Sequence, residues 1–252
     1  MTSTRKLWIW LILLLTASFA VLLLVGRDIS IKAPPVPERV VTQSGETLFT
    51  RADIERGRQV WQSMGGMQLG SIWGHGGYVA PDWSADWLHR EAIARLDLWA
   101  TAEHGKAYGQ ITEEQQSALQ RRLQSDMRRN TYYTESGTIT ISDDRAQAIT
   151  AVAGHYISLF GNDPATAVLR ENYAMKNDTV PDRANREAMA AFFWWTAWAA
   201  SAERPGTSIT YTNNWPSEPL VGNRPPSSTF IWSAFSVTFL LAGIGLLGWH
   251  HA

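Results

Sequence analysis

The chain has 252 residues, of which 45% are apolar and 18% are charged, and its formal charge is −1. This composition indicates one or two folded units and excludes a disordered or fibrous protein. Lys plus Arg number 22 against 23 Asp plus Glu, which argues against nucleic acid as a partner, because nucleic-acid-binding surfaces need concentrated positive charge. Cysteine is absent, which excludes disulfides, thiolate metal sites and the C-x-x-C-H motif that attaches haem covalently.

Residues 1–26 and 229–252 contain uncharged apolar runs of 19 and 21 residues. Each run is long enough to cross a bilayer, which takes roughly 20 helical residues. The first run has two interpretations, a cleaved signal peptide or a retained anchor, and its length and the absence of a following small-x-small cleavage site favour the anchor. Arg5 and Lys6 favour a cytoplasmic amino terminus. We therefore predict two transmembrane helices in contact with lipid, with both termini in the cytoplasm.

The segment between the apolar runs predicts a folded domain with a flexible connection on each side. Residues 27–49 contain three prolines and predict an extended linker. Residues 50–203 predict the folded domain itself. Residues 204–228 contain five prolines and predict an irregular segment that returns to the membrane.

The predicted domain is mainly helical. Capping residues, among them the capping box at Thr112, and apolar periodicity place its helices. These helices are expected at about 51–64, 84–104, 113–129, 142–160, 164–173 and 182–202. The glycine-rich residues 67–79 are expected to form a loop. Residues 131–141 carry β-formers on both sides of a turn and predict a β-hairpin, expected to be the only sheet.

Residue chemistry alone identifies no catalyst. The chain has six histidines, and no pair has the spacing that brings two imidazoles to one metal. The glycine-rich run 74–77 follows no predicted strand, so we reject it as a phosphate-binding loop. These observations indicate a membrane-anchored, tryptophan-rich helical domain.

Three sequence blocks carry a resemblance to a known family. The blocks are RGRQVWQSMGGM at 56–67, continued by GSIWGHGGYVAPDW at 70–83; TYYTESG at 131–137; and YTNNWPSEPLVGN at 211–223. In this order they resemble the amino-terminal region of quinol-dependent nitric oxide reductases. In that family one polypeptide begins with a transmembrane helix, continues into an extramembranous domain with a cytochrome c fold, and then enters a catalytic helix bundle. The resemblance implies a cytochrome c-like helical domain flanked by two transmembrane helices.

The resemblance also implies that this domain holds no haem. In cytochrome-dependent relatives, C-x-x-C-H stands shortly before a loop that matches residues 74–81. This match places Gly66, Leu69 and Gly70 where the two cysteines and the histidine would be, and none of the three can attach or ligate haem. Haem b, haem b3 and the non-haem iron of the complete enzyme are implied to lie on later helices.

Two further sets of residues follow from the resemblance. The backbone carbonyls of Gly76 and Tyr78 match positions that help to coordinate calcium in relatives, and the alternative is a purely structural turn. Trp73, Tyr78 and Trp215 are predicted to contact the catalytic helix bundle, because exposed aromatic side chains commonly anchor interfaces.

Two functions remain open from the sequence. The first is the anchor and docking portion of a quinol-dependent nitric oxide reductase, which reduces two NO to N2O and water with two electrons and two protons. The chain ends at Ala252, before the expected catalytic helices, so it is predicted to be inactive alone. The second is an independent two-span membrane protein with a haem-free binding or sensor domain. Either would lie in a bacterial inner membrane with its large domain on the periplasmic or outer face.

Overall fold

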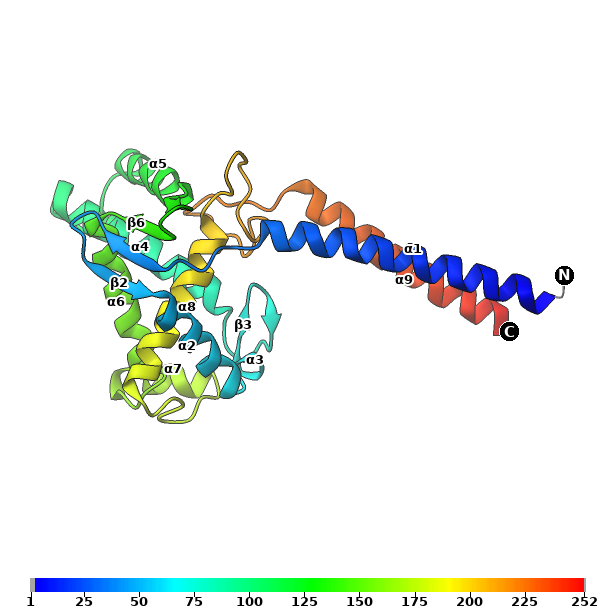
Figure 1. Ribbon diagram of the computed structural model, residues 1–252. Coiled ribbons are helices and arrows are strands. Elements are labelled where there is room, and N and C mark those ends of the chain that lie inside the picture. Colours follow the sequence, from blue (N-terminus) through cyan, green and yellow to red (C-terminus); the bar gives the residue numbers. More distant parts are fainter. Residues whose placement is uncertain (1–2, 252) are drawn as a thin grey trace. The chain divides into compact units, whose positions relative to one another are not determined.

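The computed structural model describes residues 3–251, and its contacts divide the chain into two units, Met1–Pro35 and Val36–Ala252. The first unit contains α1 (Ser3–Lys32), a single long helix (Figure 1). The side chains of α1 are exposed from Thr4 onward. The second unit contains the folded domain and α9 (Ser227–His251), which has no buried residue. Both helices are long and apolar enough to cross a membrane, as the sequence predicts.

The helices of the domain begin where side chains cap their first turn. α2 and α5 each begin with a capping box, formed by Thr50 with Asp53 and by Thr112 with Gln115. α4 is capped by Asp82, so it begins ahead of the predicted Ser84. The helices are α2 (Arg51–Ser63), α3 (Gly66–Leu69), α4 (Trp83–His104), α5 (Glu113–Arg128), α6 (Asp143–Leu159), α7 (Ala167–Asn172) and α8 (Arg183–Ser201), with 3-10 turns at Tyr108–Gln110 and Pro164–Thr166.

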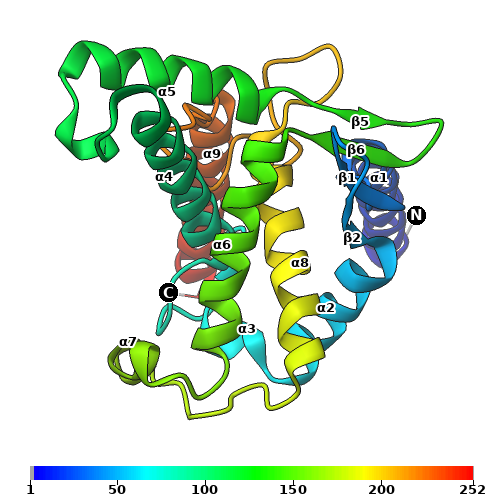
Figure 2. The same cartoon turned by 90° about the vertical axis from the view of Figure 1, so that its left-hand side faces the viewer.

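Helix α8 forms the centre of the domain. Every residue from Ala188 to Ser201 is buried, because α2, α4 and α6 all pack against this helix (Figure 2). Gly57 lets α2 approach closely, since a Cβ atom at this position would overlap the carbonyl group of Ala188. The run of bulky aromatic residues on α8 is therefore enclosed, by neighbouring helices and also by Phe49 and Tyr211.

The domain contains more sheet than the sequence predicts. The expected hairpin is present as β5 (Tyr132–Tyr133) and β6 (Thr138–Ile141). It belongs to a four-stranded sheet of order β2-β1-β6-β5, in which β1 (Arg39–Thr42) pairs parallel to β6 and antiparallel to β2 (Thr47–Thr50). The expectation of a single hairpin is therefore wrong.

The two added strands also correct the predicted domain boundary. β1 and β2 lie within or at the edge of residues 27–49, the predicted linker, and the folded unit begins at Val36. Val40 on β1 and Ile139 on β6 lie opposite each other and are both fully buried. Burial of this apolar pair fixes β1 against the domain. In the sequence, β1 is too short to be recognised as a strand next to the neighbouring prolines.

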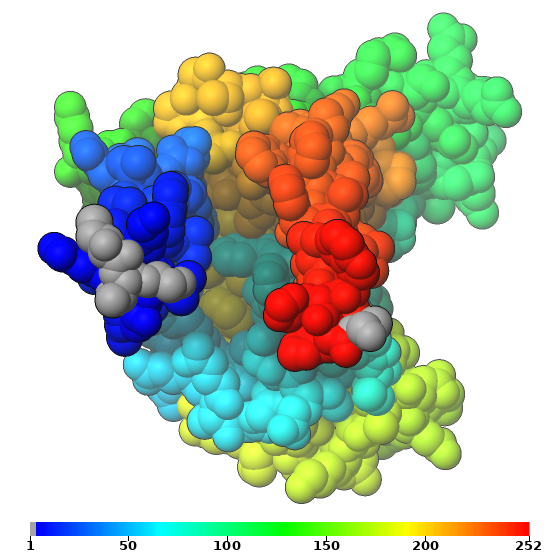
Figure 3. Space-filling view, turned by 90° about the vertical axis from the view of Figure 1, so that its right-hand side faces the viewer, coloured from blue at the N-terminus to red at the C-terminus, as the bar shows by residue number. Residues whose placement is uncertain are grey.

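Residues 67–79 are also more ordered than the expected loop. They contain most of α3 and a two-stranded sheet of β3 (Ser71–Ile72) and β4 (His75–Gly76). In Figure 3 this part of the chain, in cyan, is exposed on the face of the Val36–Ala252 unit from which α9, in red, projects.

Candidate functional site

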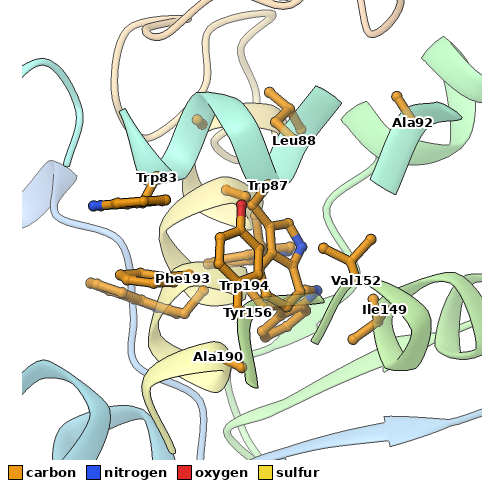
Figure 4. Close-up of a cluster of buried hydrophobic side chains, with 14 of the residues drawn as sticks. Trp83, Trp87, Leu88, Ala92, Ile149, Val152, Tyr156, Ala190, Phe193 and Trp194 are labelled. Carbon is orange, nitrogen blue, oxygen red and sulfur yellow. The ribbon is translucent and has the colours of Figure 1, made fainter. Parts of the chain in front are cut away.

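A cluster of aromatic rings fills the middle of the domain (Figure 4). Trp83, at the start of α4, is fully buried and stacks on Phe193 of α8, with ring centroids 5.7 Å apart and planes at 14°. Trp61 and Tyr156 meet Trp83 edge-on at 6.3 and 6.0 Å. Trp87, one turn after Trp83, stacks on Tyr156 at 5.1 Å. These are the offset and edge-to-face geometries that aromatic rings prefer.

The residues at the three expected haem-attachment positions lie directly against this cluster. A Cβ atom at Gly66 would overlap the indole ring of Trp61, and one at Gly70 would overlap the indole of Trp83. Leu69 is partly buried and packs against the same core. Any side chain at Gly66 or Gly70 would have to displace a buried indole, so the inner side of this segment is occupied by tryptophan.

Asp82 holds the segment between α3 and α4 in place. Its Oδ1 accepts hydrogen bonds from the amides of Ser84 and Ala85, which caps α4. Its Oδ2 accepts from the amide of Gly74 at 2.6 Å and from the hydroxyl of Ser71 at 2.8 Å. One carboxylate thus connects the β3–β4 turn with the first turn of α4.

Gly76 and Tyr78, the predicted calcium ligands, lie in the same segment. Gly76 has φ +143°, and a Cβ atom there would overlap the carbonyl oxygen of Gly70, so glycine is required. Tyr78 is 88% exposed. Within residues 3–251, no three His, Asp or Glu side chains are grouped so that they could hold a metal ion. Calcium at these carbonyls stays a prediction, and it would need further oxygen ligands from outside the loop.

The three predicted interface residues differ in their surroundings. Tyr78 is exposed, and Trp215 is 48% exposed, with its indole Nε1 beside Gly74. Trp73 departs from the expectation of an exposed aromatic residue. It is half-buried, its Nε1 donates to the carbonyl of Thr196 at 2.9 Å, and its ring lies 5.6 Å from that of Trp195. Trp73 therefore holds the β3–β4 segment on α8. Of the three predicted interface residues, Tyr78 and Trp215 are the exposed ones.

A buried charged network that the sequence analysis missed lies beside the aromatic cluster. Glu91 of α4 pairs with Arg145 of α6 at 2.6 Å, and both side chains are almost completely buried. Glu91 also accepts a hydrogen bond from Nε1 of Trp87 at 3.0 Å. The spacing of Trp87, Glu91, Arg95 and Trp99 places these residues on one face of α4, which is the signal that could have revealed the network.

Arg95 continues this network toward the surface. Its guanidinium is fully buried and pairs with Asp126 of α5 and with Asp144 of α6. Burial alone would raise the pKa of Asp144, but the nearby Ser142 hydroxyl, the charge of Arg95 and hydrogen bonds from Arg95 and Trp99 hold that pKa below its ordinary value. Asp144 therefore remains ionised as the partner of Arg95, and the network joins α4, α5 and α6.

Tyr156 links the aromatic cluster to a second polar group. Its hydroxyl donates to Oδ2 of Asp86 at 2.6 Å, and Arg90 donates to the same oxygen at 2.7 Å. Burial raises the pKa of Tyr156 well above its ordinary value, and the negative charge of Asp86 raises it further. The phenol therefore stays protonated and serves as a fixed hydrogen-bond donor.

The comparison of the sequence with protein-family models matches residues 37–217 to the cytochrome c-like domain of the nitric oxide reductase protein NorB. No curated protein matches the chain. The matched range begins at the start of the folded unit and includes the aromatic cluster, the glycine-rich segment and Trp215. The match confirms the resemblance of the sequence blocks to nitric oxide reductase. The chain belongs to the family defined by the NorB cytochrome c-like domain of nitric oxide reductase.

Proposed function

We propose that the chain is the part of a quinol-dependent nitric oxide reductase that carries the extramembranous domain and its membrane anchors. We also propose that this domain transfers no electrons through a haem. The observation that carries this proposal is the position of Trp61 and Trp83, whose indoles lie against Gly66 and Gly70 at the expected attachment positions. A chain without cysteine offers no thiol for covalent attachment. Electrons then reach the enzyme from quinol in the membrane.

The domain acts in this proposal as a rigid docking element for the catalytic helix bundle. Its exposed apolar surface near the glycine-rich segment consists of Met67, Tyr78, Val79 and Trp215, and we name it the docking surface. Asn214, next to Trp215, donates to the carbonyl of Arg224 at 2.8 Å, three residues before α9 begins. The docking surface is therefore tied to the chain segment that enters the predicted membrane helix.

Assembly with the catalytic helices tests this function. The purified chain, supplied with quinol and nitric oxide, is expected to form no nitrous oxide above a no-protein control, because its described residues group no ligands for an iron centre. Coexpression with the catalytic helical portion is expected to give quinol-dependent nitrous oxide. Tyr78→Ala/Trp215→Ala should reduce copurification at least tenfold, since central aromatic contacts commonly contribute more than about 1.4 kcal/mol to binding.

The matched control for this experiment is Val168→Ala on α7, an exposed apolar residue outside the docking surface. Its copurification should equal that of the unmodified chain. Nitrous oxide formed by the isolated chain would refute the docking role, and so would full copurification of the double variant. Failure of the unmodified chain to copurify with the catalytic helical portion would support an independent binding or sensor protein instead.

Reporter fusions test the proposed topology. Two membrane helices flank the domain, so a fusion at Gly105, at the end of α4, should report the outer side of the membrane. A fusion after His251 should report the cytoplasm. The same side for both positions would show that the two helices do not both span.

A further inference from the structure

Helix α5 presents a polar face that lines a surface hollow of about 520 Å³. The hollow is lined by Arg121, Gln124, Ser125, Arg128, Arg129 and Glu203. Arg121, Gln124, Ser125 and Arg128 follow the spacing i, i+3, i+4 and i+7, which places them on one side of α5, and Arg129 follows at the C-cap. The opposite side of α5 is buried through Leu119, Leu123 and Met127. Figure 2 shows this helix along the upper edge of the domain.

The hollow carries a net positive charge although the whole chain is nearly neutral. Three guanidinium groups face one carboxylate, a local charge of 3 − 1 = +2. Arg121 and Arg129 are exposed, and neither forms an ion pair with any residue in the range 3–251. By contrast, Arg122 on the same helix pairs with Glu103 at 2.8 Å and lies over the ring of Trp99. Two arginines at the hollow thus keep donors for a ligand.

Arg128 gives the hollow a rigid floor. Its side chain is only 20% exposed and pairs with Glu203 at 2.7 Å. It also donates to the carbonyl oxygens of Gly222 at 2.6 Å and Ser208 at 2.7 Å. These contacts join the end of α5 to the segment that leads to α9. A ligand bound beside Arg128 would therefore brace α5 against that segment.

We propose that this hollow binds a phosphate group. The planar guanidinium matches the oxygens of phosphate and forms paired, charge-assisted hydrogen bonds with them. Gln124 and Ser125 add neutral donors, and no large apolar side chain lines the hollow, so the recognised part of the ligand is small and polar. The phosphate belongs either to an anionic lipid headgroup or to a free phosphate compound.

Calorimetric titration of the full chain in phosphatidylcholine nanodiscs with inorganic phosphate, at constant ionic strength, tests the proposal. Saturable binding is expected, and Arg121→Gln/Arg129→Gln should weaken it at least tenfold. Arg122→Gln is the matched control, because its side chain is engaged away from the hollow, and it should change the affinity less than twofold. Unchanged thermal unfolding of all three proteins would show that the fold is intact.

A second set of nanodiscs containing phosphatidic acid distinguishes the two sources of phosphate. If lipid headgroups occupy the hollow, added phosphate will bind more weakly in these discs to the unmodified chain. If a free phosphate compound is the ligand, the lipid composition will leave the affinity unchanged. The absence of saturable phosphate binding in phosphatidylcholine discs, or equal binding by the unmodified chain and the double variant, would overturn the proposal.

Discussion

Replacement of Trp83 by alanine is expected to lower the free energy of unfolding by about 3–5 kcal/mol, the range for large aromatic truncations in a core. Trp83 has no exposed surface, and its ring contacts those of Trp61, Tyr156, Phe160, Tyr173 and Phe193. Such a loss is a large fraction of the roughly 5–15 kcal/mol that stabilises a typical domain. Denaturant unfolding of the purified chain in detergent, followed by near-ultraviolet circular dichroism, measures it.

Trp215→Ala is the control for this experiment, because it removes the same side-chain type from a half-exposed position. It should cost less than about 1 kcal/mol, in line with surface substitutions. Equal losses for Trp83→Ala and Trp215→Ala would show that the aromatic cluster is not the main stabilising element of the domain.

Arg145→Met is expected to cost about 3–5 kcal/mol, because it leaves the Glu91 carboxylate buried without its ionic partner. Glu91→Leu/Arg145→Met should recover most of that loss, since apolar side chains of similar size avoid the cost of burying either charge. The indole of Trp87 would lose its acceptor in the double variant, which limits the recovery by about 1 kcal/mol.

A double-mutant cycle that includes Glu91→Leu alone measures the coupling between Glu91 and Arg145. A coupling energy near zero would show that the two charges act independently in the folded domain. A double variant as unstable as Arg145→Met would show that neighbouring polar groups require the ion pair itself.

The longer helices could be predicted from local sequence because their caps are local, whereas the four-residue α3 falls mostly in the expected loop. Thr50 and Thr112 each bond to a residue three positions later, so the signal lies within one turn. The four-stranded sheet could not be predicted in the same way. Its parallel pairing joins β1 to β6, which are far apart in the chain, and no property of either short strand identifies the other.

The glycines of the candidate site could be identified by sequence resemblance, but the reason for them could not. The resemblance places Gly66 and Gly70 at the expected haem-attachment positions, whereas their contact with Trp61 and Trp83 depends on how α2 and α4 pack. For Trp73, by contrast, the sequence suggests an exposed side chain, and the structure places it differently. Its positive φ of 53° and its bond to the carbonyl of Thr196 place the ring on α8, and a glycine-rich sequence gives no sign of this.

The domain is proposed to contain an aromatic core and no haem. This is tested most directly by expressing the chain together with a c-type haem maturation system and measuring bound haem. Gly66→Cys/Leu69→Cys/Gly70→His restores the C-x-x-C-H spacing and serves as the control that the maturation system can modify this segment. This variant should gain covalent haem and lose native near-ultraviolet circular dichroism, because its new side chains displace Trp61 and Trp83. The unmodified chain is expected to show no Soret absorption after purification, whereas one bound haem per unmodified chain, covalent or not, would contradict a haem-free domain.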